Sequence, residues 1–402
     1  MAWYSLMRRH ALALVVGTLL AACGGDEGPK APPLPVGPVP PGGSGLPVRA
    51  VTFATGLVNP WGLAFLPDGR LLVTERPGRM RIVSADGTTL SAPLAGVPAV
   101  HAQGQGGLLD VAIDPDFAIN QLVYWSYAED GATGLSGTAV ARGRLNGTTL
   151  DNVQVIFQQV PKVLASDVNY GARLVFANDK TLFVTLGERG TDNPTAPSND
   201  GAQSLANHLG KVVRINPDGS VPASNPYVGV TGVVPELWSL GHRNPQGAAL
   251  NPVSGELWLD EHGPLGGDEV NRIQAQHNYG WPVRSYGCPD GSPAGVGCAI
   301  GGGTHFPNFD EPLYKWTPTS TAPSGMLFYT GDAFPEWKGS LFVGALAGMS
   351  LWRFPLVGNS VGAPEQLFSA LGERIRDVRQ GPDGLIYLLT DNASGRIVRL
   401  QR

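Results

Sequence analysis

The sequence is poor in charge, and its body contains no basic cluster. Asp, Glu, Lys and Arg make up 15% of the 402 residues, and the formal net charge is −5. A nucleic-acid-binding protein needs a basic patch or stripe for the phosphate backbone, so we expect no nucleic-acid partner. The hydrophobic fraction of 42% is enough for a large core, which excludes disorder for most of the chain.

Two further kinds of signal are missing. Helical periodicity is nearly absent, and only residues 202–209 suggest one or two turns of helix. Nucleotide and metalloprotease motifs do not occur, and the glycine run 301–303 lacks the lysine of a phosphate-binding loop. Glycine and proline, in contrast, are abundant, with 55 and 35 residues. Together with many short apolar runs, they are typical of a turn-dense all-β protein.

Cysteine is scarce as well, with three residues in the chain. Cys288 and Cys298 flank a Gly/Pro-rich loop. In an oxidising compartment they would close this loop as a disulfide. A metal site is the alternative, although two cysteines without further ligands nearby make a poor one.

The N-terminus has the features of an export signal. Basic residues near the N-terminus precede an apolar run, residues 11–20, which is too short to span a bilayer but suits a signal peptide. Small residues then lead to Cys23 in a pattern that resembles a bacterial lipobox. We therefore expect residues 1–22 to be removed and Cys23 to be acylated; a plain secretory signal is the alternative. Residues 23–48 are rich in Pro and Gly and predict a tether. The predicted location is the periplasm, with a lipid anchor in the outer membrane.

A short sequence pattern recurs six times after residue 49: a polar or glycine-containing turn followed by an apolar strand. Each copy predicts a tight hairpin between paired strands. Six units at irregular spacing favour blades with insertions over a β-sandwich. We predict an all-β, six-bladed β-propeller over residues 49–402. The six turns lie at 67–70, 116–120, 178–180, 252–255, 336–339 and 382–384.

Several other segments are too polar and too rich in glycine for strands. Arg243, Arg374 and Arg376 in these segments could converge on an anionic ligand, because guanidinium pairs bidentately with carboxylates. Hard oxygen ligands suited to Ca²⁺ are offered by Glu261, Asp268 and Glu269. The alternative is that these segments are propeller loops held by local ion pairs and Asx turns.

In their order and composition, these segments resemble the soluble pyrroloquinoline quinone (PQQ) glucose and aldose sugar dehydrogenases. The match covers nearly all of the body, from about Phe53 to the C-terminus. The combination is specific, although single motifs are not. It is carried by GQGGLLD (104–110), GHRNPQG (241–247), EHGPLGGDEVN (261–271), NYGWP (278–282), APSG (322–325) and RIRDV (374–378).

The resemblance implies a six-bladed propeller with PQQ over its central channel. It also implies oxidation of an aldose to its lactone, with the electrons passed to an external acceptor. A monomer and a homodimer both stay open.

The resemblance also assigns site residues by position. Arg374 and Arg376 would pair with the carboxylates of PQQ, Arg243 and Asn244 would contact its quinone side, and Gln105 would hydrogen-bond near it. The main-chain carbonyls of Gly263 and Pro264 would bind a Ca²⁺ ion that also touches PQQ.

One position departs from the family. The general base of the family is a histidine four residues before an arginine that corresponds to Arg173, and that position here is Asn169. An amide cannot accept the sugar's proton near neutral pH. His101 and His262 are candidates for a substitute base. The alternative functions are a ligand-binding propeller that has lost its base and, ranked last, a Ca²⁺-dependent lactonase-type hydrolase.

Overall fold

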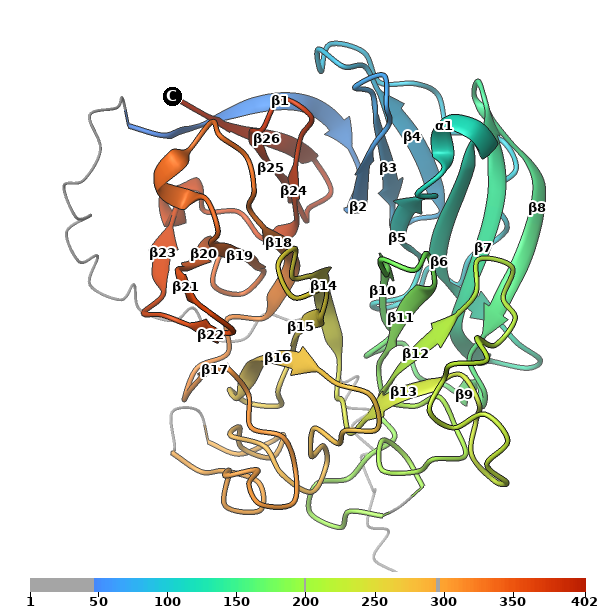
Figure 1. Ribbon diagram of the computed structural model, residues 1–402, viewed down its shortest axis with the longest axis vertical. Helices are drawn as coiled ribbons and strands as arrows, with labels where there is room; N and C mark the ends of the chain where they lie inside the picture. The colour runs from blue at the N-terminus through green and yellow to red at the C-terminus, as the bar shows by residue number, and fades with distance from the viewer. Residues whose placement is uncertain (1–46, 199, 294–296) are drawn as a thin grey trace, which may run out of the picture.

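The computed structural model describes residues 47–198, 200–293 and 297–402 of the protein. Their strands form six antiparallel sheets around a common axis (Figure 1), and the first strands of the six sheets neighbour one another in a closed ring. The predicted all-β, six-bladed propeller is confirmed.

The predicted N-terminal segments lie largely outside the described residues. These are the signal peptide 1–22, Cys23 and the tether as far as residue 46, and they stay predictions. Within the described part, the first strand begins at Arg49. No helix in this part is long and apolar enough to cross a membrane.

The strands of each blade are given from the axis outward; the first blade has three strands, and the outermost strand of the last blade is β1. The innermost strands are β2 (Pro60–Phe65), β5 (Leu108–Ile113), β10 (Gly171–Phe176), β14 (Pro245–Leu250), β18 (Pro323–Phe328) and β24 (Ile375–Gln380). The second strands are β3 (Leu71–Glu75), β6 (Leu122–Asp130), β11 (Leu182–Leu186), β15 (Leu257–Glu261), β19 (Leu341–Ala345) and β25 (Ile386–Thr390). The third strands are β4 (Arg79–Val83), β7 (Leu135–Asn146), β12 (Lys211–Ile215), β16 (Asp268–Ile273), β20 (Ser350–Phe354) and β26 (Gly395–Gln401). The outermost strands are β8 (Thr149–Gln158), β13 (Leu237–Leu240), β17 (Tyr314–Trp316), β23 (Glu365–Leu367) and β1 (Arg49–Leu57).

The remaining elements are short. They are β9 (Val163–Leu164), which pairs with β7, the pair β21 (Leu356–Val357) and β22 (Ser360–Val361), helix α1 (Phe117–Asn120), and the 3₁₀ turns η1 (Pro335–Trp337) and η2 (Ser369–Leu371). Each of the six turns expected from the sequence lies between the first and the second strand of a blade. The repeated sequence pattern therefore marks one hairpin per blade.

The two ends of the described chain close the ring. Strand β1 pairs antiparallel with β26, so the last blade has the order β1-β26-β25-β24. Blue β1 lies beside dark red β26 in Figure 1. This pairing joins the first and the last strand of the described part by backbone hydrogen bonds, and it leaves the inner ring without a gap.

The predicted helix at residues 202–209 is wrong, because this segment forms turns. The buried side chain of Lys211 explains the difference. Its ammonium group donates hydrogen bonds to the carbonyls of Ala202 (2.9 Å), Gly201 (3.3 Å) and Leu209. Carbonyls that converge on one ammonium group do not point along a common axis, as the carbonyls of a helix do.

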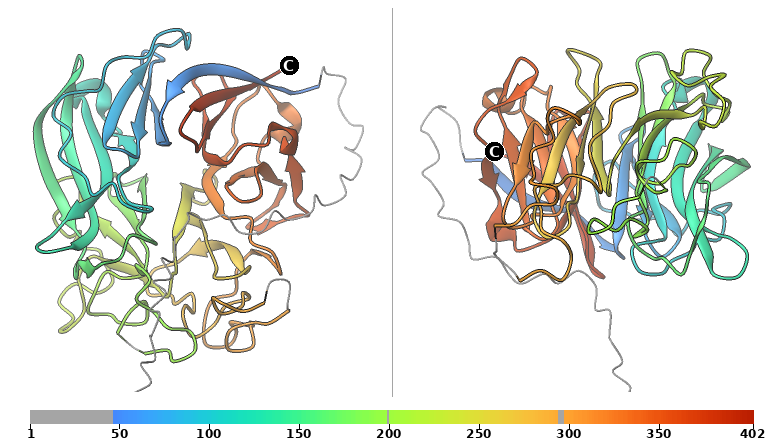
Figure 2. Two further views of the ribbon diagram at one scale, coloured as in Figure 1. Left: turned by 180° about the vertical axis from the view of Figure 1, so that it is seen from behind. Right: turned by 90° about the horizontal axis from the view of Figure 1, so that it is seen from below.

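The predicted disulfide between Cys288 and Cys298 is present, with 5.1 Å between the two Cα atoms. It lies in the long segment between β16 and β17, which extends beyond the sheets at the rim of the ring (Figure 2). Cys288 pairs with Leu265 through two backbone hydrogen bonds of 3.0 and 3.2 Å. The disulfide loop is therefore attached to the loop that follows β15.

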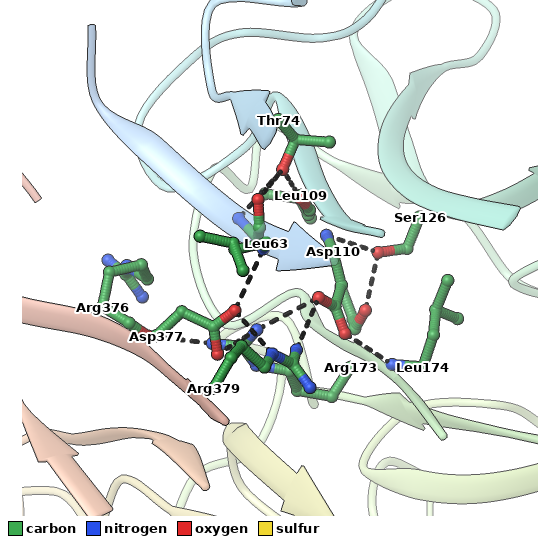
Figure 3. A network of polar contacts seen from close by, with 12 residues as sticks. Leu63, Thr74, Leu109, Asp110, Ser126, Arg173, Leu174, Arg376, Asp377 and Arg379 are labelled. Atoms are coloured by element: carbon green, nitrogen blue, oxygen red, sulfur yellow. Dashed lines mark hydrogen bonds and ion pairs between the residues drawn. The ribbon is translucent and has the colours of Figure 1, made fainter. Parts of the chain in front are cut away.

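A buried charge network crosses the axis of the ring (Figure 3). Nη1 of Arg173 lies 3.1 Å from Oδ1 of Asp110 and 3.2 Å from Oδ1 of Asp377. Arg379 contacts the same two carboxylates at 3.3 and 2.9 Å. Two arginines and two aspartates balance in charge, and they tie together the inner strands β5, β10 and β24.

Candidate functional site

One end of the axis collects the predicted site residues, and strand direction is the reason. Neighbouring strands are antiparallel, so in every blade the first strand begins where the second strand ends. Gln105, Asn169, Arg243 and Arg374 lie just before first strands, whereas Gly263 lies just after the second strand β15. Segments that are far apart in the sequence therefore meet at one end of the ring.

Asn169 contacts two other residues at this end. Its backbone N–H donates to Oε1 of Gln105 at 2.9 Å, and its side-chain Nδ2 donates to Oε1 of Glu188 at 2.5 Å. Asn244 joins the same group, because its Oδ1 accepts from the backbone N–H of Gly171 at 3.2 Å. The structure thus brings together three of the predicted residues and adds Glu188, which the sequence analysis missed.

Arg243 faces the loop that was predicted to bind the metal. Its Nη1 donates to the carbonyl oxygens of Gly263 at 2.7 Å and His262 at 3.4 Å. Its Nη2 lies 3.6 Å from the exposed carboxylate of Asp290 in the disulfide loop. Its Nε is buried and has no hydrogen-bond partner among the described residues. The guanidinium group therefore keeps donor capacity that the described chain does not use.

Arg374 and Arg376 share one carboxylate. Asp391 lies 2.8 Å from Nη2 of Arg376 and 3.5 Å from Nη2 of Arg374. Burial raises the pKa of Asp391, but the positive charges of Arg376, Arg374 and Arg76 outweigh burial and lower it below its ordinary value. Asp391 therefore balances only part of the positive charge of the arginines around it.

The pKa of His262 reflects the arginines that lie around it. Burial and the positive charges of Arg376, Arg243 and Arg374 lower its pKa to about 3. Its Nε2 lies 3.0 Å from the carbonyl oxygen of Pro323. An imidazole whose protonated form is so unfavourable is a weak proton acceptor at neutral pH, so His262 is a poor substitute for the missing base.

His101 is engaged in a different way. Its Nδ1 lies 2.6 Å from Asp130 and its Nε2 lies 2.8 Å from Asp167. Burial lowers its pKa, but the hydrogen bonds to Asp167 and Asp130 outweigh burial and raise it. Both ring nitrogens are therefore occupied, and His101 offers no lone pair to a sugar hydroxyl.

The expected metal ligands separate into two groups. Asp268 is used by the backbone: its Oδ1 accepts from Gly263, and its Oδ2 accepts from Thr321 and Ala322. Glu261 and Glu269 line a pocket beside Arg243. The described residues contain no cluster of three or more His, Cys, Asp or Glu side chains that could hold a metal ion. The lactonase alternative therefore gains no support.

Four acidic residues that organise this end follow a simple rule. Glu75, Glu188, Glu261 and Asp391 each lie at or just after the end of a second strand. Three of them hold the segment that enters their own blade: Glu75 accepts from Val58 at 2.7 Å, Glu261 from Arg243 at 2.7 Å and Glu188 from Asn169 at 2.5 Å. An acidic residue after an apolar second strand was the sequence signal that could have identified Glu188 and Asp391.

Asp260 gives the protein a pH-dependent stability. Its side chain is fully buried, and neither carboxyl oxygen has a hydrogen-bond partner among the described residues. Burial raises its pKa to about 8, although the positive charge of Arg173 opposes the shift. The unfolded carboxyl has a pKa of about 3.9. Between these two values the folded state holds a proton that the unfolded state has lost, so the free energy of unfolding falls as the pH rises.

We expect Asp260→Asn to remove this decrease in the free energy of unfolding with rising pH. The variant should be more stable than the wild type at the alkaline end of the window and similar to it at the acidic end. Urea unfolding at the two ends measures the difference. Asp332→Asn, at an exposed aspartate, is the matched control and should follow the wild type. If the profiles of Asp260→Asn and the wild type run parallel, the assignment to Asp260 is wrong.

The fold and this end of the axis define the class of protein: a six-bladed propeller whose loops bring three arginines, three amides and a pair of backbone carbonyls to one end of the ring. Comparisons with known proteins agree with this class. A family model for glucose / sorbosone dehydrogenase matches residues 57–399. The chain belongs to this family.

Individual relatives cover almost the whole propeller. Aldose sugar dehydrogenase YliI of Escherichia coli K12 is 43% identical over 347 residues, which is 86% of this chain and 90% of the relative. A crystal structure of a glucose dehydrogenase has a TM-score of 0.81 at 47% identity, and the match covers 87% of this chain and 99% of that one. The PQQ-bound aldose sugar dehydrogenase of Streptomyces coelicolor has a TM-score of 0.69 at 30% identity, covering 88% and 98%.

Proposed function

We propose that this protein oxidises aldose sugars to lactones with PQQ and Ca²⁺, and passes the electrons to an external acceptor. The observation that carries the proposal is the convergence of Arg243, Arg374 and Arg376 around His262, whose pKa is lowered to about 3 by burial and by these three charges. A polycarboxylate ligand is the natural partner of such a group. The PQQ-bound relative from Streptomyces coelicolor supports the choice of cofactor.

The chemistry of the donors fits PQQ. Buried Nε atoms of Arg243 and Arg376 have no partner among the described residues, and a buried unpaired donor is costly. The carboxylate and carbonyl oxygens of PQQ would supply the missing acceptors. Nη1 of Arg376 is already held by Gln246 at 2.8 Å, which fixes the direction of the guanidinium plane. Such preorganised positive charge stabilises negative charge as it develops on a reduced ligand.

Ca²⁺ fits only if its oxygen ligands come from both the chain and PQQ. The chain offers the two main-chain carbonyls of Gly263 and Pro264, whereas Ca²⁺ takes six to eight oxygen ligands. The remaining oxygens would come from PQQ and water. Because Arg243 donates to the Gly263 carbonyl, we expect its Nη1 to leave that oxygen when a cation binds there.

The chain's own residues set the geometry of the reaction. PQQ, when bound, supplies the acceptor for the hydride of the sugar. Asn169 holds Gln105 through its backbone N–H, and its side chain lies against Glu188. The side chain at position 169 can therefore position a sugar hydroxyl but cannot take its proton. We expect the wild-type rate to be limited by this proton transfer.

The test is a titration of the Ca²⁺-loaded protein with PQQ, followed by a dye-reduction assay with a panel of aldoses. We expect saturable binding and slow turnover. Binding without turnover would favour the alternative, a ligand-binding propeller that has lost its base. Absence of PQQ binding would contradict the proposal. Removal of Ca²⁺ with a chelator, as the control, should weaken PQQ binding if the two share a site.

A further inference from the structure

Arg76 is an arginine at this end of the axis that the family resemblance does not assign. It follows the last residue of β3, so it lies where a second strand ends, as Asp391 does in the last blade. Its backbone N–H donates to the carbonyl of Asn59 at 2.9 Å, and its carbonyl accepts from Leu108 at 3.0 Å. These bonds fix its backbone between the first two blades.

The side chain of Arg76 reaches the segment that carries Gln105. Its Nη1 donates to the carbonyl oxygen of Gly104, the residue just before Gln105. Among the described residues the guanidinium group makes no other hydrogen bond and no ion pair with a carboxylate. It is also accessible to solvent. A guanidinium group has five donors, so most of its binding capacity faces outward.

Three arginines act on the carboxylate of Asp391. The single carboxylate of Asp391 contacts Arg376 and Arg374, and the charge of Arg76 acts on it as well. Three positive side chains thus surround one negative side chain. A ligand with several carboxylates would restore the balance, whereas a neutral sugar would not.

We infer that Arg76 is a further anion-binding residue of the site, which contacts a carboxylate of the bound polycarboxylate. The inference rests on the proposed function and extends the set of contacts from Arg374 and Arg376 to the first blade. A guanidinium group suits this role because it pairs with carboxylates bidentately and stays charged at all relevant pH values. The bond to Gly104 would orient the side chain before the ligand arrives.

The experiment compares Arg76→Gln with the wild type by fluorescence titration with PQQ at several salt concentrations, without any turnover. The indole of Trp61, which lies 5.5 Å from the guanidinium carbon of Arg376, provides the signal. We expect the dissociation constant to rise about tenfold or more, because a lost charge-assisted hydrogen bond costs that much. We also expect a weaker salt dependence. Arg76→Lys should recover part of the affinity.

The matched control is Arg70→Gln, in the β2–β3 turn at the other end of the same blade, where Arg70 pairs with Asp68. It should bind PQQ as the wild type does. A purely structural role of Arg76 predicts a loss of unfolding free energy in Arg76→Gln with unchanged affinity and salt dependence, and that result would overturn the inference.

A second probe separates this inference from the proposed function. Benzene-1,3,5-tricarboxylate presents carboxylates without a quinone. If the wild type binds this probe through Arg76 but does not bind PQQ, the anion site stands and the proposed cofactor is wrong. If Arg376→Gln weakens PQQ binding and Arg76→Gln does not, the proposed function stands and the inference about Arg76 is wrong. If neither ligand binds the wild type, both are overturned.

Discussion

Replacing Asn169 with histidine is expected to raise the rate of sugar oxidation by the PQQ- and Ca²⁺-loaded protein by about 10²–10⁴-fold, the usual contribution of a general base. The backbone accepts the change, because Asn169 has a φ of 51° and His, like Asn, is enriched in this left-handed region. Glu188 would orient the new imidazole by accepting its N–H, as it now accepts the amide of Asn169.

The measurement is the steady-state rate of dye reduction with an aldose, at saturating PQQ, as a function of pH. The variant should gain an acidic limb, since an imidazole has an ordinary pKa of about 6.5 and acts as a base only when neutral. Asn169→Ala is the control: it removes the amide without adding a base, so it should show no gain. If Asn169→His and Asn169→Ala have equal rates while PQQ binding is intact, the proton is taken elsewhere.

Replacing Arg173 with methionine is expected to lower the free energy of unfolding by about 3–5 kcal/mol, because it breaks a buried ion network and leaves uncompensated charge. Arg173 is almost fully buried between Asp110 and Asp377, whose side chains are fully buried. Its Nε and Nη2 also donate to the carbonyls of Gln246 and Arg376. The variant therefore loses one positive charge where β10 contacts β5, β14 and β24.

Urea unfolding at neutral pH measures this loss. Lys338→Met is the control, because Lys338 pairs with Asp332 at the surface and such pairs contribute less than about 1 kcal/mol. Mild acid should partly rescue Arg173→Met, since protonation removes the charge of the buried pair of carboxylates that the substitution leaves facing each other. Equal losses in the two variants would mean that the network contributes no more than a surface pair.

Much of the fold could be predicted from the sequence. The six hairpin turns mark short-range structure, in which two strands pair across a few residues, so local composition is enough to find them. The disulfide between Cys288 and Cys298 is local in the same sense. The segment 202–209 was predicted wrongly because its conformation depends on the buried ammonium group of Lys211, a tertiary contact that local propensity does not contain.

Parts of the candidate site required the structure. Gln105, Asn169, Arg243 and Arg374 were named from motifs, but their proximity depends on the order and direction of the strands. The engagement of His101 by two carboxylates and the low pKa of His262 depend on neighbours from other blades. The sequence named both histidines as candidate bases, and only the tertiary contacts argue against them.

The sequence by itself determined the class of fold, the family and the identity of the groups that can bind an anion. The reason is that turns, strand patterns and motifs depend on residues that are close together in the chain. The tertiary structure decided which of these groups meet. It closed the ring through β1 and β26, placed Glu188 against Asn169 and gathered the arginines around one carboxylate. The physical reason is that charge, burial and hydrogen bonding at this end arise between residues from different blades, whose separation along the chain carries no information about their distance in space.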